Sequence, residues 1–89
     1  MKPWKIGAKY FIRTVTQHFT GRLVAVHKNE LVLVDAAWIA DSGRFAQAIA
    51  TGDELKEVEP YPNCCEVIIN RAAITDAAEI FYNLPRKQI

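Results

Sequence analysis

The chain has 89 residues, a formal net charge of +1 and 51% hydrophobic residues. A chain this short holds one hydrophobic core, so the sequence predicts a single domain over residues 1–89 and excludes a multidomain enzyme. No apolar run approaches the roughly 20 residues of a membrane-spanning helix, and residues 1–7 lead into no apolar signal segment. We therefore expect a globular cytoplasmic protein that makes no membrane contact.

Alternating β-branched and aromatic side chains predict strands in the first third of the chain. Residues 9–19 have the composition of one long strand, and two shorter apolar runs follow at 22–27 and 30–35. The two shorter runs are separated by Lys28 and Asn29, and asparagine tolerates the left-handed conformation of a tight turn. We predict a hairpin there. Because the third run is apolar on both faces, we expect one face in a core and the other against a partner.

Residues 36–65 change in character and are interpreted as an insertion. The segment 44–51 is rich in alanine, has apolar residues at helical spacing and is followed by Gly52, which can end a helix. We predict one short helix within residues 42–51, with Ser42 as its cap. The acidic segment 53–62 contains two prolines and is predicted to be a connection, with a brief extended stretch at 55–58.

Two further strands are predicted near the end of the chain, at residues 66–70 and 73–77, with a break at Arg71 and Ala72. Residues 79–89 are expected to form a surface-lying tail. Five short strands and one helix predict a mainly β protein, a small and strongly bent five-strand barrel.

Two segments of this pattern resemble the signature of the Sm and Sm-like family. The first is residues 20–26 with 31–36, in which a glycine, alternating aliphatics, a turn and a Leu-x-Leu strand end in Asp-Ala. The second is residues 67–74, aliphatics followed by a short turn and an isoleucine. The matches cover about a third of the chain. The resemblance implies an SH3/Sm-like barrel and a homo-oligomeric ring of about five to seven subunits, often with RNA at its inner rim.

The chain also departs from the family pattern. The turn at residues 27–30 is one residue shorter, Asn70-Arg71 replaces the usual Arg-Gly pair, and the insertion at 36–65 is long. These departures and the small size resemble Sm-like proteins carried by phages. Two functions therefore stay open: a ring-forming RNA-binding module, or a self-assembling structural or interaction protein of a phage or mobile element without a nucleic-acid ligand.

If single-stranded RNA binds, the resemblance places it on two turns that meet at the pore. The candidate residues are His27, Lys28, Asn29, Asn70 and Arg71. Phosphate contacts by Lys28 and Arg71 would make the affinity fall with salt, and a charged His27 would strengthen it in mildly acidic solution. The alternative is that Arg71 pairs with an acid such as Glu66 or Asp35 of its own or a neighbouring chain.

Charge is unevenly distributed along the sequence. Residues 1–30 carry six basic residues and one acid, a net charge of +5, whereas residues 31–79 have a net charge of −6. The basic third either faces phosphates or meets the acidic part of a neighbouring copy, and we favour the second interpretation.

Exposed aromatic side chains are the other candidates for contact with bases. Trp38, Phe45 and Arg44 are of the types that stack on bases, but packing in a core or interface is favoured for them. Trp4 is the freer aromatic side chain and is expected to contact a neighbouring copy or a nucleic acid.

The sequence offers no evident catalytic or metal centre. Cys64 and Cys65 are adjacent and would pair only through a strained ring, so reduced thiols are expected. The two histidines lack metal-ligand spacing, and we expect neither a metal nor another cofactor. Three aspartates could act as paired carboxylates, but their settings are typical of turns and caps, so we do not expect an enzyme. These are Asp35, Asp41 and Asp76.

Overall fold

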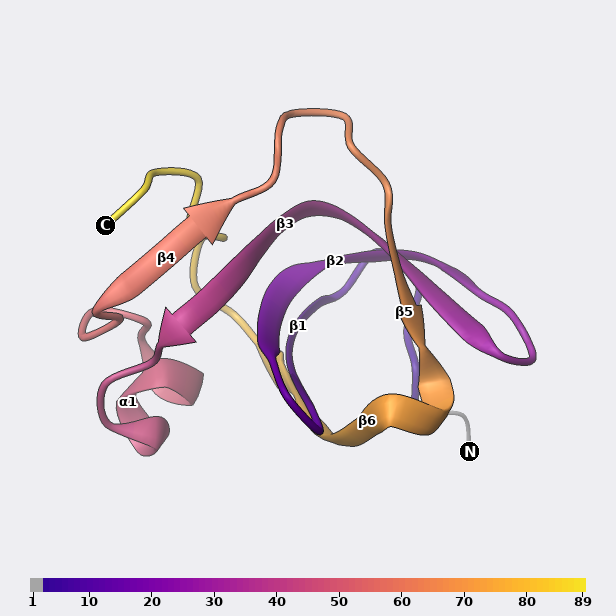
Figure 1. The fold of residues 1–89 in the computed structure, drawn as a ribbon, viewed down its shortest axis with the longest axis horizontal. Coiled ribbons are helices and arrows are strands. Elements are labelled where there is room, and N and C mark those ends of the chain that lie inside the picture. Colours follow the sequence, from indigo (N-terminus) through magenta and orange to yellow (C-terminus); the bar gives the residue numbers. More distant parts are fainter. Residues whose placement is uncertain (1–2) are drawn as a thin grey trace.

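The computed structural model describes residues 3–89. Six antiparallel strands form one sheet in the order β4-β3-β2-β1-β6, and β5 pairs with β3 beside this path (Figure 1). The elements are β1 (Lys9–Thr14), β2 (His18–Val26), β3 (Glu30–Asp41), α1 (Phe45–Ala50), β4 (Glu57–Pro60), β5 (Val67–Asn70), the 3-10 turn η1 (Arg71–Ala73) and β6 (Ile74–Ile80). The mainly β class with one short helix is confirmed, but the predicted number of five strands is wrong. Over residues 3–89, no helix has the length and apolar character needed to cross a membrane.

The first predicted strand is in fact two strands joined by a tight turn. Thr14 and Gln17 close this turn twice, because the Thr14 hydroxyl donates to the Gln17 carbonyl at 2.8 Å and accepts from the Gln17 amide at 3.0 Å. Val15 lies at the tip with 80% of its surface exposed. A run of β-branched residues therefore turns here because a threonine side chain satisfies the backbone of the turn.

The predicted hairpin between the second and third apolar runs is confirmed. β2 and β3 pair along their length, and the His27 amide donates to the Glu30 carbonyl at 2.8 Å to close the turn. β2 also passes through Gly21 without a break, where a Cβ atom would lie only 3.0 Å from the Leu33 side chain. Gly21 therefore permits close packing inside a strand and does not end one.

β3 is twice as long as predicted and runs through Asp41, so residues 36–41 belong to the sheet and not to an insertion. Its first half pairs with β5 and its second half with β4. Between the halves, and within the continuous strand, Asp35 has a φ of 50°, a left-handed conformation. The extra strand β4 overlaps the stretch at 55–58 that was expected to be only briefly extended.

The predicted short helix is present as α1, but Ser42 does not cap it. The cap position is Arg44, and no side chain makes a capping hydrogen bond there. Gly52 follows the helix with a φ of 70°, as expected for a residue that ends one. At this end, the Tyr82 hydroxyl donates to the Ala48 carbonyl at 2.6 Å.

The C-terminal segment is fastened to the sheet. β6 continues to Ile80, beyond the predicted end at residue 77. Farther along, Arg86 donates to the carbonyl oxygens of Ala36 at 2.9 Å and Tyr61 at 2.8 Å. The backbone of Ile89 exchanges hydrogen bonds with Val58 and so covers the outer edge of β4.

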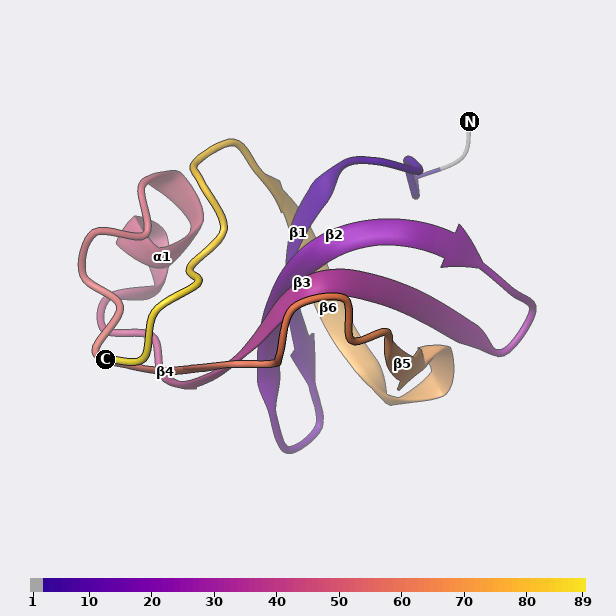
Figure 2. The same ribbon diagram turned by 90° about the horizontal axis from the view of Figure 1, so that it is seen from above.

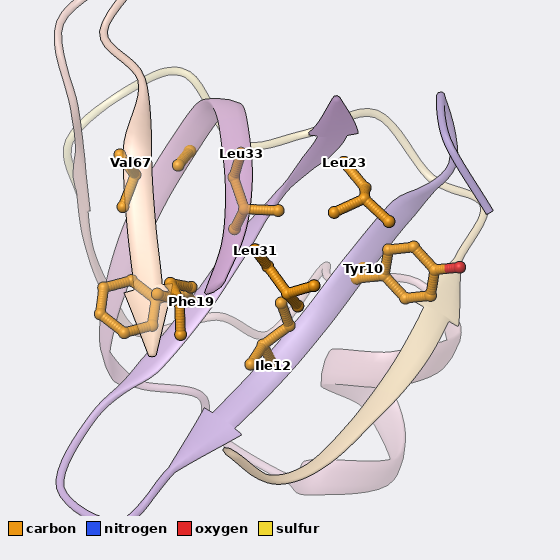
Figure 3. Close-up of a cluster of buried hydrophobic side chains, with 9 residues drawn as sticks. Tyr10, Ile12, Phe19, Leu23, Leu31, Leu33 and Val67 are labelled. Carbon is orange, nitrogen blue, oxygen red and sulfur yellow. The ribbon is translucent and has the colours of Figure 1, made fainter. Parts of the chain in front are cut away.

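Two clusters of buried side chains hold the sheet together. The first, which we call the inner cluster, fills the concave side of β1, β2, β3 and β5 (Figure 3); its members are Tyr10, Ile12, Phe19, Leu23, Leu31, Leu33, Ala36, Val67 and Ile69. The second, the helix cluster, packs α1 and β4 against the opposite face; its members are Phe11, Ala37, Ile39, Ala48, Leu55, Val58 and Ile80. Viewed from above, α1 and the C-terminal segment form a separate layer beside the curved strands (Figure 2).

Candidate nucleic-acid interface

The structure brings the two candidate turns together. β5 lies antiparallel to the start of β3, with Asn70 opposite Glu30. This register places the 27–29 hairpin turn beside η1, which begins at Arg71. The side chains of His27, Lys28 and Asn29 are exposed. The five residues that the sequence selected therefore form one continuous surface at one end of the molecule.

Arg71 fastens one turn to the other. Its backbone amide donates to the Asn29 carbonyl at 2.9 Å. Its guanidinium Nη1 donates to the His27 carbonyl at 2.8 Å and to the Lys28 carbonyl at 3.4 Å. Within the described chain, Arg71 thus bonds to backbone oxygens of the hairpin and forms no ion pair with Glu66 or Asp35.

Asn70 has a structural bond of its own. Its side-chain Oδ1 accepts a hydrogen bond from the Ala72 amide at 3.0 Å and so caps η1. This bond fixes the entry of the chain into η1 and hence the position of Arg71. Asn70 nevertheless remains exposed, so its amide group is accessible on the same surface as the hairpin.

Most basic side chains of the first third are already bonded within the chain. Lys5 pairs with Glu79 at 3.1 Å, and Arg13 forms a two-bond ion pair with Asp76. The hydrogen bonds of that second pair raise the pKa of Arg13 and lower the pKa of Asp76.

Two other basic residues donate to carbonyl oxygens: Lys9 to Tyr82, and Arg22 to Gly7. Among the lysines and arginines of this third that the structure describes, only Lys28 has a side chain that bonds to no other residue, since its one contact is through its carbonyl. It is therefore available to an anion.

A hollow of about 420 Å³ lies beside Arg71. Its lining consists of Pro3, Trp4, Ile6, Val26 and Arg71. The end of β2 and the N-terminal segment thus contribute an apolar wall to a surface that otherwise carries cations. Sequence reasoning selected Trp4 and Arg71 separately, but it missed Ile6 and Val26, because two isolated aliphatic residues give no signal before their positions are known.

The other aromatic candidates lie elsewhere. Phe45 packs edge-on against Phe11 and lies under the guanidinium of Arg13, whose central carbon is 4.4 Å from the ring centre. Trp38 is 39% exposed and lies on the second half of β3, opposite Glu59 of β4. Trp38, on the second half of β3, and Phe45, on α1, therefore lie outside the surface formed by the hairpin turn and η1.

The three candidate carboxylates are not gathered into one site. Asp35 lies in the middle of β3, Asp41 accepts from the Gly43 amide at 2.9 Å, and Asp76 pairs with Arg13. Cys64 and Cys65 are free thiols. Residues 3–89 hold no cluster of three or more side chains of the kinds that bind metal ions.

Comparison with known proteins adds no relative. Neither a family model, nor a curated protein, nor a solved structure matches this chain.

Proposed function

We propose that this protein is a ring-forming small barrel that binds single-stranded RNA at the hairpin turn 27–29 and η1. The observation that carries the proposal is the set of bonds from Arg71 to the carbonyls of the hairpin. They hold Lys28 and Asn29 beside Asn70 on one rigid surface. Such pre-positioning lowers the entropy lost when a flexible strand is bound.

The proposed barrel is of the SH3/Sm type. β1 pairs with both β2 and β6, β3 pairs with β5, and the three residues of η1 connect β5 to β6. The strands are strongly curved (Figure 1), and the side chains of the inner cluster lie between them (Figure 3). Along the path β5-β3-β2-β1-β6, the two end strands are thus joined by a short turn, and this supports closure of the bent sheet around one core.

Two strand edges favour the assembly of copies into a ring. β5 pairs only with β3 and β6 only with β1 over residues 3–89, whereas Ile89 covers the outer edge of β4. Unpaired edges invite strand addition, and pairing β5 of one copy with β6 of the next satisfies both. Because the two surfaces differ, the contact is head-to-tail and forms a ring if the rotation closes.

An apolar hollow beside the free edge of β6 supports this contact. It measures about 250 Å³, and its lining is apolar except for Asp76; the other lining residues are Phe11, Phe45, Ile49, Ala77 and Ala78. On β5, Ile68 is 64% exposed and points away from the inner cluster. Since side chains alternate between the faces of a sheet, an added β5 would carry Ile68 onto the side where α1 lies.

The assembly is tested by Ile68→Asp, with Val15→Asp as the matched control. Both residues are exposed aliphatics, but Val15 lies at the β1-β2 turn. We expect wild type and Val15→Asp to form particles of several subunits in light scattering, and Ile68→Asp to be a folded monomer. A wild-type monomer of 10.0 kDa at micromolar concentration would contradict the ring.

RNA binding is tested by fluorescence anisotropy with short U-rich and A-rich RNAs at low and high salt. Lys28→Ala is the sharpest variant, because the hairpin uses only the Lys28 carbonyl and not its side chain. Each lost phosphate contact should weaken binding and flatten the slope of log affinity against log salt by about 0.7. Arg71→Ala should lose more, since it also releases the hairpin.

Arg44→Ala is the control for this measurement, because Arg44 is exposed at the start of α1 and outside the candidate surface. Its affinity should equal that of wild type. Equal losses in Lys28→Ala and Arg44→Ala would indicate attraction by general charge and would contradict the assigned site. Repetition of each turn around a ring would multiply a weak contact, so affinities are compared only between variants of the same assembly state.

The second candidate function is self-assembly as a structural or interaction protein without a nucleic-acid ligand. It is favoured by the structural bonds that Arg71 and Asn70 already make within the chain. An intact ring whose wild-type and Arg71→Ala forms both show negligible anisotropy change would support this candidate and reject RNA binding.

A further inference from the structure

Trp4 is held firmly at the edge of the candidate surface. Its ring packs edge-on against Tyr10, with 5.2 Å between the ring centres. The Tyr10 hydroxyl in turn accepts from the Lys5 amide at 2.8 Å and donates to the Pro3 carbonyl at 3.3 Å. These bonds fasten the backbone on both sides of Trp4. An aromatic ring fixed in this way can be stacked upon without first being ordered.

The hollow beside Trp4 combines an aromatic ring with a fixed cation. Arg71 lines it together with Trp4, Ile6 and Val26. Of the guanidinium nitrogens of Arg71, only Nη1 bonds to the described chain, so the N–H groups on the other two are available to a ligand. Lys28 on the adjoining hairpin adds a second charge. The hollow therefore suits a flat, weakly polar group that carries a negative charge at one side.

Trp4 also borders a second, smaller hollow, which is a poorer site for an anion. That hollow measures about 210 Å³ and contains Asp76 in its lining, with Tyr10 and Ile74. A carboxylate repels a phosphate, whereas Arg71 attracts one. The charges thus direct an anionic ligand to the Arg71 side of the indole ring.

We propose that this hollow binds one nucleobase of a single-stranded RNA, stacked on Trp4, with the adjoining phosphate at Arg71 and Lys28. The inference rests on the proposed RNA-binding function and assigns to it a base pocket that the two turns alone do not provide. Because the walls are apolar and every base has a flat face, the pocket accepts all four bases.

Tryptophan fluorescence tests the stacking directly. The chain has two tryptophans, so Trp38→Phe leaves Trp4 as the single reporter. The probes are a six-nucleotide oligouridylate and an abasic sugar-phosphate chain of the same length. We expect the oligouridylate to quench Trp4 emission and the abasic chain to leave it unchanged. Equal quenching by both probes, or no quenching by a bound oligouridylate, would overturn the base pocket.

Affinity measurements separate this inference from the function on which it rests. Trp4→Ala should weaken binding of the oligouridylate by about 5- to 150-fold, the loss expected for one stacked base, and should leave binding of the abasic chain unchanged. Trp4→Phe should retain most of the affinity, and Trp38→Ala should retain all of it.

If wild type binds the oligouridylate through Lys28 but Trp4→Ala binds equally well, the base pocket is wrong and the RNA-binding function stands. If wild type binds neither probe, both proposals are wrong. Trp4 also contacts the inner cluster. Loss of fold in Trp4→Ala would therefore leave Trp4→Leu, with the fluorescence titration, as the deciding variant.

Discussion

Tyr82 connects the C-terminal segment to α1, and removal of its hydroxyl group should lower the stability of the fold. Its hydroxyl donates to the Ala48 carbonyl at 2.6 Å, which satisfies one of the free carbonyls at the end of the helix. Its half-buried ring also closes over Gly52, where a Cβ atom would lie 2.6 Å from the ring. Tyr82→Phe keeps the ring and removes only the hydrogen bond. At neutral pH we expect the free energy of unfolding to fall by about 0.5–1.5 kcal/mol.

Alkaline solution should lower the free energy of unfolding of the wild-type protein by a similar amount. Burial raises the pKa of Tyr82 to about 12 from an ordinary value of 10.0. The unfolded chain therefore loses this proton before the folded one. The stabilisation is complete below pH 10 and disappears as the pH rises toward 12. A shift of two units corresponds to at most about 2.7 kcal/mol, and partial exposure of the ring reduces the expected effect to about 1 kcal/mol at pH 11.

Urea denaturation followed by circular dichroism at pH 7, 9 and 11 measures both effects. Wild type should lose more stability between pH 9 and 11 than Tyr82→Phe does. Tyr61→Phe is the control, because within residues 3–89 Tyr61 forms hydrogen bonds through its backbone and not through its hydroxyl. Parallel pH profiles for wild type and Tyr82→Phe, together with equal stability at pH 7, would refute the assigned role.

Three further substitutions test the packing and one ion pair. Gly21→Ala should lower the free energy of unfolding by about 1–3 kcal/mol, because the added carbon meets Leu33 at 3.0 Å; an unchanged urea midpoint would contradict this contact. Ile39→Ala should leave a cavity in the helix cluster and lower the free energy of unfolding by about 2–5 kcal/mol. The control Val15→Ala, at an exposed position, should lower it by about 0.5 kcal/mol or less.

Asp76→Asn should reduce the loss of stability that the protein shows when the pH is lowered from 7 to 3. The bonds from Arg13 lower the pKa of Asp76 below its ordinary 3.8, so the pair stabilises wild type above that value and is lost on acidification. Thermal unfolding at pH 3 and pH 7 measures the difference, and equal acid sensitivity of both proteins would speak against it.

Regular alternation and turn residues made part of the fold predictable. The hairpin at 27–29, the helix within 42–51 and the break at Arg71 all follow from local signals and are confirmed. The turn after Thr14 was missed because threonine and valine favour strands, and only the side-chain bonds between Thr14 and Gln17 reveal it. The strand propensities of single residues do not predict a turn that is closed by side-chain hydrogen bonds.

The length of β3 was missed for a different reason. Ala36 and Ala37 are fully buried, because neighbouring strands approach closely there. Alanine has little strand propensity, so tertiary packing decides the conformation. The candidate interface likewise has one part that local sequence predicts and one that it does not. The two turns were selected from the sequence, whereas the wall formed by Ile6 and Val26 depends on a spatial arrangement that no short pattern encodes.

The two clusters divide the molecule into two parts whose sequences can change largely independently of each other. Every member of the inner cluster lies outside residues 42–66, whereas Ala48, Leu55 and Val58 of the helix cluster lie within that segment. Only β3 contributes more than one residue to each. Tyr61 and Cys65 still pack against the inner cluster, so it is residues 42–58 that can accumulate substitutions, and alter the proposed contact between copies, while the support beneath the hairpin and η1 stays in place.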